Sequence, residues 1–284
     1  DRIASFLKDN GVEYSQCILH KKDSGFDKEE AKDCNLVIVL GGDGTLMRIA
    51  KKAAKYNLPI IVVDDGNKKS DKVYINLVAQ KYSNVTVLKN RFNRGKGYSV
   101  CKAIKAAHKM GITHLFQIDA DGQHDCAQCE MFLNKSKENP EALICGYPKF
   151  DETIPENRKS GRKISNNYAS FVTLTENYII DAMCGYRIYP VEPFYKICRF
   201  AYIDSHMGFD TEILVRLIWK NVPVIFLPVN VSYPVGGKSN FRMVRDNIRI
   251  SFMFARMTIG MWLRYPILLK RKKSIKSGSK STDK

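Results

Sequence analysis

Residues 114–125 read HLFQIDADGQHD, an apolar run that passes directly into a group of acidic side chains. The run at 114–118 is suited to a buried strand. Asp119 and Asp121 follow it, and alternate residues of an extended segment point to the same side, so both carboxylates can face one cation. Oxygen ligands at this spacing favour Mg²⁺ or Mn²⁺ bridging a diphosphate.

Apolar runs and helical patterns alternate on both sides of this stretch. We predict strands at residues 36–40, 60–63, 85–88, 114–118, 143–147 and 224–228. We predict helices at residues 46–56, 73–81, 100–110, 164–178 and 210–220. Such alternation predicts an α/β fold with a mostly parallel sheet and helices on both faces. Ligands of such sheets bind at the carboxyl ends of the strands.

Two further loops follow predicted strands. Asp64 and Asp65 end the strand at 60–63 and offer acceptors for ribose hydroxyls or a base edge. The loop NRGKG, with Asn93, Arg94 and Lys96, is basic and flexible and opens a helix, which suits phosphate contact. Together with Asp119, these five side chains are the predicted nucleotide-binding residues.

The chain carries a formal net charge of +17 and has eight cysteines. The positive charge suits a partner with phosphates or an anionic membrane surface. Eight cysteines in a chain of this length do not form a disulfide framework, so we expect a cytoplasmic protein. The sequence leaves open whether the protein also makes peripheral contact with the inner face of the membrane. Nucleic-acid binding is not expected, because the sequence has no repeat of aromatic and basic residues.

Six segments, in this order, resemble glycosyltransferase family 2, near its dolichol-phosphate mannosyltransferase-like branch. The resemblance extends over about residues 59–265. The segments are VVDDGN (62–67), NRGKGYSV (93–100), DADGQHD (119–125), DAMCGYRIYP (181–190), FDTEILVRL (209–217) and VSYPVGGKSNFRM (231–243).

The resemblance implies a nucleotide-diphospho-sugar transferase (Rossmann-like) fold and a hexosyltransferase that depends on Mg²⁺ or Mn²⁺. The implied partners are a UDP- or GDP-sugar donor and a lipid-phosphate or glycolipid acceptor. The resemblance assigns Asp64 and Asp65 to the nucleoside. It assigns Asp119, Asp121 and Gln123 to the metal. It assigns Arg187 and Lys238 to a phosphate or the acceptor.

A hydroxyl acceptor would need a general base to take its proton. Asp181 and Asp210 are both candidates, and the sequence does not choose between them. For Asp210 the alternative is a helix N-cap ahead of the segment at 212–214.

The segment before residue 59 departs from the family pattern. It contains an apolar run followed by Gly41, Gly42, Asp43, Gly44 and Thr45, and this GGDGT loop resembles the amino-terminal part of an NAD kinase. Glycines let the backbone approach a phosphate, and an aspartate there can bind a metal or act as a base. The alternatives to a transferase are therefore an NAD kinase-like phosphotransferase and an inactive chimera that keeps the fold, with its boundary near residues 57–62.

The sequence divides into four parts. Residues 1–58 form the kinase-like βα segment, packed on the sheet, and residues 59–240 form the catalytic domain. Residues 241–270 form a basic amphipathic helix, which either anchors the protein at a membrane interface or packs on the catalytic domain. Residues 271–284 are a basic tail that we expect to be disordered.

Overall fold

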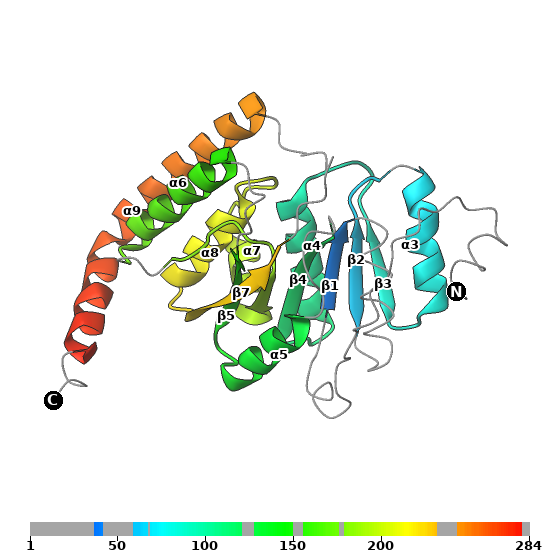
Figure 1. Ribbon diagram of the computed structural model, residues 1–284, viewed down its shortest axis with the longest axis horizontal. Coiled ribbons are helices and arrows are strands. Elements are labelled where there is room, and N and C mark those ends of the chain that lie inside the picture. Colours follow the sequence, from blue (N-terminus) through cyan, green and yellow to red (C-terminus); the bar gives the residue numbers. More distant parts are fainter. Residues whose placement is uncertain are drawn as a thin grey trace.

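The computed structural model describes residues 37–41, 59–67, 69–120, 128–149, 156–175, 179–231 and 243–279. Within them lies a seven-stranded sheet with the order β3-β2-β1-β4-β6-β5-β7 (Figure 1). The strands are β1 (Val37–Gly41), β2 (Ile60–Asp64), β3 (Val85–Lys89), β4 (His114–Ala120), β5 (Leu143–Lys149), β6 (Arg187–Pro190) and β7 (Val224–Asn230).

Helices cover both faces of the sheet (Figure 1). They are α3 (Lys69–Lys81), α4 (Lys96–Lys109), α5 (Cys129–Glu138), α6 (Glu156–Thr173), α7 (Val191–Phe200), α8 (Phe209–Trp219) and α9 (Met243–Ser279). Alternate residues of β2 enter two separate cores: Ile61 and Val63 pack with α4, α7 and α8, whereas Ile60 and Val62 pack with α3 and α5. The predicted fold class is confirmed, because a sheet buried on both faces is what a doubly wound fold requires.

An interior strand of the sheet, β1, comes from the kinase-like segment. β1 pairs in parallel with both β2 and β4, so that Val37 lies opposite Ile60 on one side and Phe116 on the other. β1 ends at Gly41, and the rest of the predicted GGDGT loop, Gly42–Thr45, lies outside the described residues. The kinase-like segment therefore contributes a strand to the interior of the sheet.

One strand runs against the others. β6 is antiparallel to both β4 and β5, while the remaining pairs are parallel. We did not predict β6 or the two helices α5 and α7. The four residues of β6 are all buried, so they show no alternation of polar and apolar side chains that would indicate a strand.

Two helices differ from their predicted bounds in a way that bears on function. α4 begins at Lys96 rather than at residue 100, directly after Gly95, whose φ of 92° is open to glycine and costly for other residues. The basic side chain of Lys96 therefore stands in the first turn of a helix and not in a loop. α9 extends to Ser279 and so includes residues 271–279 of the tail that we expected to be disordered.

The long helix α9 packs along α6 and α8 (Figure 1). Met253, Met257 and Met261 form its buried side. Arg256 reaches from α9 to the fully buried Glu212 of α8, with 2.5 Å between Nη2 and Oε2, and Arg216 contacts the other oxygen of the same carboxylate at 2.7 Å. This two-arginine pairing of a buried carboxylate fixes α9 on the catalytic domain.

Among the described residues, no helix combines the length and the apolar character that crossing a bilayer requires.

Candidate active site

Three charged side chains from distant parts of the chain meet at the carboxyl end of β4. The Nζ of Lys96 lies 2.7 Å from Oδ2 of Asp119 and 2.7 Å from Oδ2 of Asp210. Asp119 is the penultimate residue of β4, and Asp210 stands in the first turn of α8. Asp119 and Lys96 keep about a quarter of their side chains exposed, at 24% and 22%, and Asp210 keeps 8%. The end of β4 and the first turns of α4 and α8 thus form one polar cluster that is open to solvent.

Gln117 of β4 forms hydrogen bonds with both carboxylates of this cluster. Its side chain is fully buried in β4, and its Nε2 donates to Oδ1 of Asp119 at 3.3 Å and of Asp210 at 3.5 Å. Tyr189 donates its hydroxyl to the Oε1 of Gln117 at 3.1 Å, which orients the amide. We did not single out Gln117, although a polar residue in the middle of an apolar strand was a signal for it.

The pKa values of the cluster reflect burial and charge pairing. Burial lowers the pKa of Lys96, but the carboxylates of Asp119 and Asp210 outweigh that effect and raise it above its ordinary value. Burial raises the pKa of Asp210, and the neighbouring ammonium of Lys96 opposes this rise without cancelling it. Lys96 is therefore a permanent cation at neutral pH.

Asp65 shapes the basic loop that precedes α4. Its Oδ1 accepts hydrogen bonds from the backbone N–H of Arg94 at 2.8 Å and from Nδ2 of Asn90 at 2.7 Å. Its Oδ2 accepts a hydrogen bond from the backbone N–H of Gly95 at 2.8 Å. We predicted that Asp65 binds the nucleoside, and in the structure its carboxylate also determines the course of the loop that carries Asn93, Arg94 and Lys96.

Asp64 ends β2 and is almost completely buried, at 1% exposure. Its Oδ1 accepts a hydrogen bond from the backbone N–H of Asn67 at 2.9 Å, and Lys72 approaches Oδ2 to 4.0 Å. Asp64 and Asp65 therefore both lie at the carboxyl end of β2, next to the loop before α4, as predicted. Their contact with a nucleoside stays a prediction.

The two candidate bases have different surroundings. Asp181 is 4% exposed and accepts from Arg162 at 2.5 Å and from the backbone N–H groups of Met183 and Cys184 at 2.8 and 2.6 Å. Both of its oxygens are therefore engaged in holding a turn against α6. Asp210, in contrast, shares Lys96 with Asp119.

Arg187 links the segments that carry these two aspartates. It is fully buried in β6, where Nη1 donates to the backbone carbonyl of Asp210 at 2.7 Å and Nη2 to that of Ala182 at 2.9 Å. Its buried Nε has no hydrogen-bond partner among the described residues. The assignment of Arg187 to a phosphate or the acceptor stays a prediction.

Gly185 lies against the first metal-ligand candidate. A Cβ at this position would stand 2.1 Å from Oδ2 of Asp119, so only glycine leaves the carboxylate in place. The other predicted site residues Asp121, Gln123 and Lys238 lie outside the described residues. Within the described part of the chain, no group of three metal-binding side chains is present.

Two protein-family models match the chain. The family described as glycosyl transferase family 2 matches residues 44–204, which is more than half of the chain. The chain belongs to glycosyl transferase family 2. The prediction of a glycosyltransferase with the nucleotide-diphospho-sugar transferase fold is therefore confirmed.

The relatives of this family 2 transferase include a dolichyl-phosphate beta-glucosyltransferase of Dictyostelium discoideum. It is 30% identical over 227 residues, which cover 75% of this chain and 67% of the relative. Among solved structures, a mannosyltransferase from Pyrobaculum calidifontis in complex with GDP-Man and Mn²⁺ is similar, with a TM-score of 0.46 and 13% identity. That match covers 71% of this chain and 57% of the other.

The second match concerns the amino-terminal segment. The family described as ATP-NAD kinase N-terminal domain matches residues 5–70. An NAD kinase of Clostridium tetani is 38% identical over 66 residues, which are 23% of this chain and 24% of that kinase. The two family matches overlap at residues 44–70, and the predicted junction near 57–62 falls inside that overlap. A chain composed of two unrelated segments is consistent with both matches.

Proposed function

We propose that this protein transfers a sugar from a UDP- or GDP-sugar to an acceptor, in a reaction that requires Mg²⁺ or Mn²⁺. The observation that carries the proposal is the meeting of Asp119, Lys96 and Asp210 at the carboxyl end of β4. The carboxyl edge of a parallel sheet is where ligands of this fold class bind. Membership of glycosyl transferase family 2 supports the reaction class.

The residues at this edge fit a divalent cation. The cluster holds two carboxylates against one ammonium, a formal charge of 1 − 2 = −1, and Asp119 is partly exposed. Carboxylate oxygens are the ligands that Mg²⁺ and Mn²⁺ prefer. In the proposal Asp119, Asp121 and Gln123 hold the metal, which when bound would neutralise charge on the departing diphosphate.

Lys96 is proposed to bind the diphosphate of the donor. It stands in the first turn of α4, where backbone N–H groups and the helix dipole already favour an anion. Its ammonium remains charged, since its two carboxylate neighbours raise its pKa. A cation at Asp119 and a phosphate at Lys96 would each replace one half of the ion pair that now joins these two side chains.

For a hydroxyl acceptor, Asp210 is the better base of the two candidates. Its carboxylate belongs to the same cluster as Asp119, and burial raises its pKa toward the range that suits proton transfer. Asp181 instead pairs with Arg162 of α6 and accepts from backbone N–H groups of its own turn. We therefore assign Asp181 to positioning the segment at 181–185, which ends in Gly185 beside Asp119.

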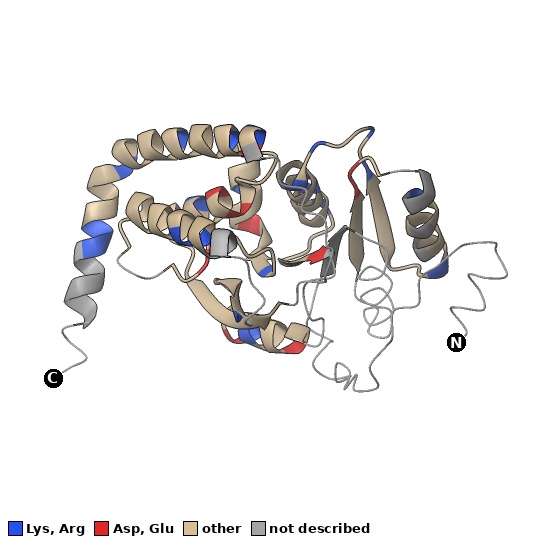
Figure 2. Cartoon of the chain, turned by 45° about the horizontal axis from the view of Figure 1, so that its top comes forward, with Lys and Arg blue, Asp and Glu red and all other residues tan. Residues whose placement is uncertain are grey.

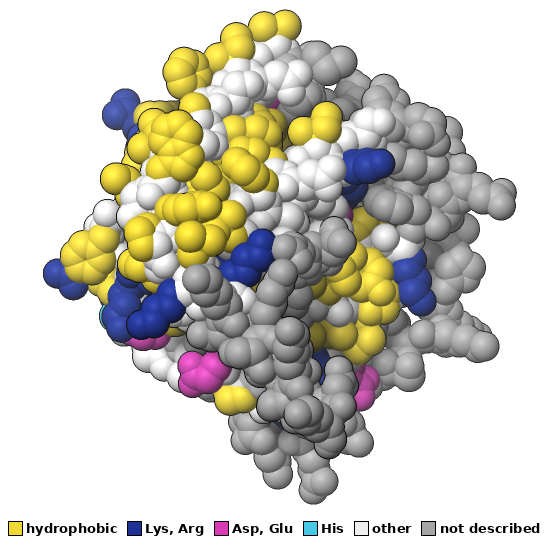
Figure 3. All heavy atoms as spheres, turned by 90° about the vertical axis from the view of Figure 1, so that its left-hand side faces the viewer, with side chains coloured by type: hydrophobic (Ala, Val, Ile, Leu, Met, Phe, Trp, Pro, Cys, Tyr) yellow, Lys and Arg dark blue, Asp and Glu magenta, His cyan; other side chains and the backbone are white. Residues whose placement is uncertain are grey.

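We also propose that the outer side of α9 rests on a membrane surface, where a lipid-linked acceptor would be found. An apolar stripe at helical spacing runs along this side, and each of its side chains is more than half exposed. The stripe consists of Val244, Ile248, Phe252, Ile259, Leu263 and Ile267. Ile164 and Phe171 of α6 are also exposed, and Figure 3 shows hydrophobic side chains gathered over this face.

Charge supports the same contact. Basic positions recur along α6 and α9 (Figure 2), and the chain carries a net charge of +17. An apolar stripe flanked by arginine and lysine is the pattern of a helix that lies in the interface of an anionic bilayer. The acceptor is then a lipid phosphate or a glycolipid presented from that bilayer.

Calorimetric titration of UDP and GDP, with and without Mn²⁺, tests the transferase site. We expect metal-dependent binding of at least one diphosphate, which Asp119→Asn abolishes and the exposed control Glu141→Gln leaves unchanged. Binding of ATP or NAD without binding of either diphosphate would favour the kinase-like alternative. Unchanged diphosphate affinity in Asp119→Asn would overturn the assignment of Asp119.

Sedimentation with vesicles tests the membrane contact. We expect Phe252→Glu and Leu263→Glu to reduce binding to vesicles that contain an anionic phospholipid. Phe200, on α7, is 77% exposed, so Phe200→Glu is a matched control that should retain binding. Equal loss in all three variants would contradict a contact through α9.

A further inference from the structure

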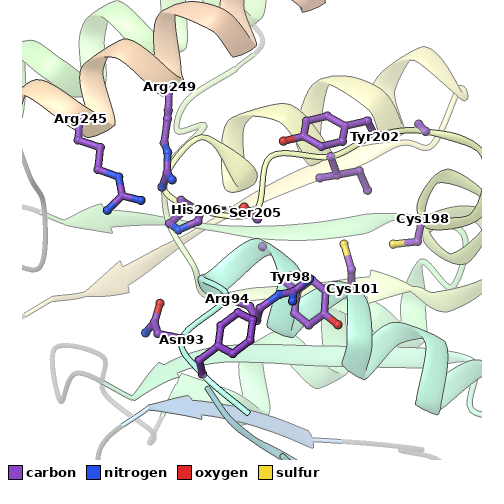
Figure 4. Close-up of a pocket in the computed structure, with 14 residues that line it drawn as sticks. Asn93, Arg94, Tyr98, Cys101, Cys198, Tyr202, Ser205, His206, Arg245 and Arg249 are labelled. Atoms are coloured by element: carbon purple, nitrogen blue, oxygen red, sulfur yellow. Dashed lines mark hydrogen bonds between the residues drawn. The ribbon is translucent and has the colours of Figure 1, made fainter. Parts of the chain in front are cut away.

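A cavity of about 500 Å³ opens beside the loop that precedes α4 (Figure 4). Three segments line it: the loop and first turns of α4 at 92–101, the segment at 198–206, and the start of α9. The backbone of Gly95 and Gly97 packs tightly against the segment at 204–205, since a Cβ on either glycine would lie 2.3 or 2.1 Å from a carbonyl oxygen there. The cavity therefore has a wall that is fixed by close backbone contact.

One end of the cavity is basic. Arg245 and Arg249 stand one turn apart on α9 and point toward His206, with Arg94 below them (Figure 4). Among the described residues that line the cavity there is no aspartate or glutamate. Within the same described residues, none of the three arginines takes part in an ion pair. Three guanidinium groups around one concave surface create a field that favours an anion.

The basic end is shaped by its neighbours. The guanidinium of Arg94 lies over the rings of Tyr98, at 4.5 Å, and Phe92, at 5.1 Å, which holds this long side chain in place. His206 has its Nδ1 2.7 Å from the hydroxyl of Ser205. Burial lowers the pKa of His206, and the positive charges of Arg249 and Arg245 lower it further, against the opposing effect of Asp204 and Asp246. The two arginines of α9 thus point toward the imidazole, and their charge lowers its pKa.

The other end of the cavity is apolar. Cys101, Cys198, Ala201 and Ile203 line it, and Tyr202 stands beside them (Figure 4). A ligand that fills the whole cavity would therefore join an anionic group to an apolar body. The exposed stripe of α9 begins at Val244 and Ile248, next to the two arginines, so the basic end lies beside the face that we propose to rest on a membrane.

We propose that this cavity binds a phosphate ester, with its phosphate held by Arg94, Arg245 and Arg249. Guanidinium groups bind phosphate oxygens through paired, charge-assisted hydrogen bonds. The apolar end takes the remainder of the ester. Lys96 of the same loop pairs with Asp119 and Asp210 and does not line the cavity, so the proposed phosphate site is distinct from that cluster.

The ester has two sources, the headgroup of a membrane lipid and a soluble metabolite, and titration of the full chain distinguishes them. The probes are inorganic phosphate, dihexanoyl phosphatidic acid below its micellar concentration, and phosphatidylcholine vesicles with and without phosphatidic acid. Tighter binding of the lipid phosphate than of inorganic phosphate indicates a lipid headgroup. Equal affinity for the two indicates that a soluble phosphate is the ligand and that the apolar end is not used.

Arg245→Ala/Arg249→Ala is the test variant. We expect about a tenfold or larger loss of phosphate affinity, since charge-assisted bonds are the strong ones. The control Lys109→Ala/Lys220→Ala removes the same charge from exposed positions outside the cavity and should bind like the unsubstituted protein. Absence of binding to every probe, or equal binding by the test variant, would overturn the proposal.

A titration of His206 by NMR gives a second readout. Phosphate at the basic end should raise the pKa of His206, because an anion then opposes the two arginines. The test variant should raise the same pKa without any phosphate, since the two positive charges are removed. The chain has five histidines, and His206→Gln identifies the signal. Asp119→Asn should keep this response even if it loses diphosphate binding, so failure of one proposal is separable from failure of the other.

Discussion

The α-carbon of Gly185 lies directly against the carboxylate of Asp119, with no room for a side chain between them. Gly185→Ala would place a methyl group within 2.1 Å of Oδ2, and the carboxylate would have to rotate away from Lys96. We expect metal-dependent binding of UDP or GDP to fall by at least tenfold. The free energy of unfolding should fall by about 1–3 kcal/mol, as in other overpacked sites. Calorimetry and urea unfolding measure the two effects.

Gly161 offers the matched control for this substitution. It lies in α6, and a Cβ there meets no atom within 4 Å. Gly161→Ala should stabilise the protein by about 0.5–1 kcal/mol and leave diphosphate binding unchanged. If Gly185→Ala binds diphosphate as well as Gly161→Ala does, the contact with Asp119 has no part in the site.

Lys96→Met should destabilise the protein in a manner that depends on pH. Without the ammonium, Asp210 loses the main group that lowers its pKa, so the pKa rises further. A carboxyl with a raised pKa in the folded state costs stability above that pKa, and the cost disappears as the pH falls below its unfolded value. We expect a loss of about 3 kcal/mol at pH 8 and a smaller loss at pH 5.

Urea unfolding of Lys96→Met and of the unsubstituted protein at both pH values measures this difference. The control is Lys102→Met, because Lys102 donates to the backbone carbonyl of Lys89 and to the side-chain Oδ1 of Asn90, and to no carboxylate among the described residues. Its effect on stability should be the same at both pH values. An equal loss for Lys96→Met at pH 5 and pH 8 would contradict the coupling between Lys96 and Asp210.

Asp65→Ala should weaken nucleotide binding without unfolding the protein. It removes the acceptor of three hydrogen bonds that hold Asn90 and the backbone of Arg94 and Gly95. We expect a stability loss of about 3 kcal/mol, since each of the three bonds contributes about 1 kcal/mol net. Affinity for UDP or GDP should fall by about tenfold, measured by calorimetry, because the loop no longer presents Lys96 in one position. Unchanged affinity would show that the loop binds no part of the nucleotide.

Glu212→Ala should be among the most destabilising single substitutions. The carboxylate is fully buried and pairs with both Arg216 and Arg256. Its removal leaves two arginines without their partner and frees α9 from α8, so we expect a loss of about 3 kcal/mol or more in urea unfolding. Glu192→Ala breaks exposed pairs with Lys196 and His108 and should change stability little. Similar effects of the two substitutions would show that Arg256 does not anchor α9.

The parts of the site that lie at strand ends could be predicted from the sequence. Asp64 and Asp119 follow apolar runs, and strand ends of a parallel sheet share one edge, so their common location follows from pattern and topology. Contacts between distant segments could not be predicted in the same way. The pair of Lys96 and Asp210 joins residues 114 positions apart, and it depends on how α8 packs against α4.

The cavity beside α9 shows the same limit. Arg245 and Arg249 looked like part of a basic amphipathic face, which they are by spacing alone. Whether that face meets solvent, a membrane or a pocket depends on the rotation of α9 about its axis, and the pair of Arg256 with Glu212 sets that rotation. Similarly, the role of Gly185 depends on its close approach to Asp119, and the sequence alone does not show that these two residues meet.

The place of β1 between β2 and β4 bears on how such a protein could arise by recombination. A parallel ladder is made by main-chain N–H and C=O groups, which every strand carries whatever its side chains are. A strand from an unrelated enzyme can therefore complete the sheet if its length and its apolar character are suitable. The exchange leaves β2 and β4 paired on both sides, whereas deletion of the kinase-like segment would open two unsatisfied edges in the middle of the sheet. The kinase-like segment thus belongs to the folding unit of the sheet and is not an appendage to it.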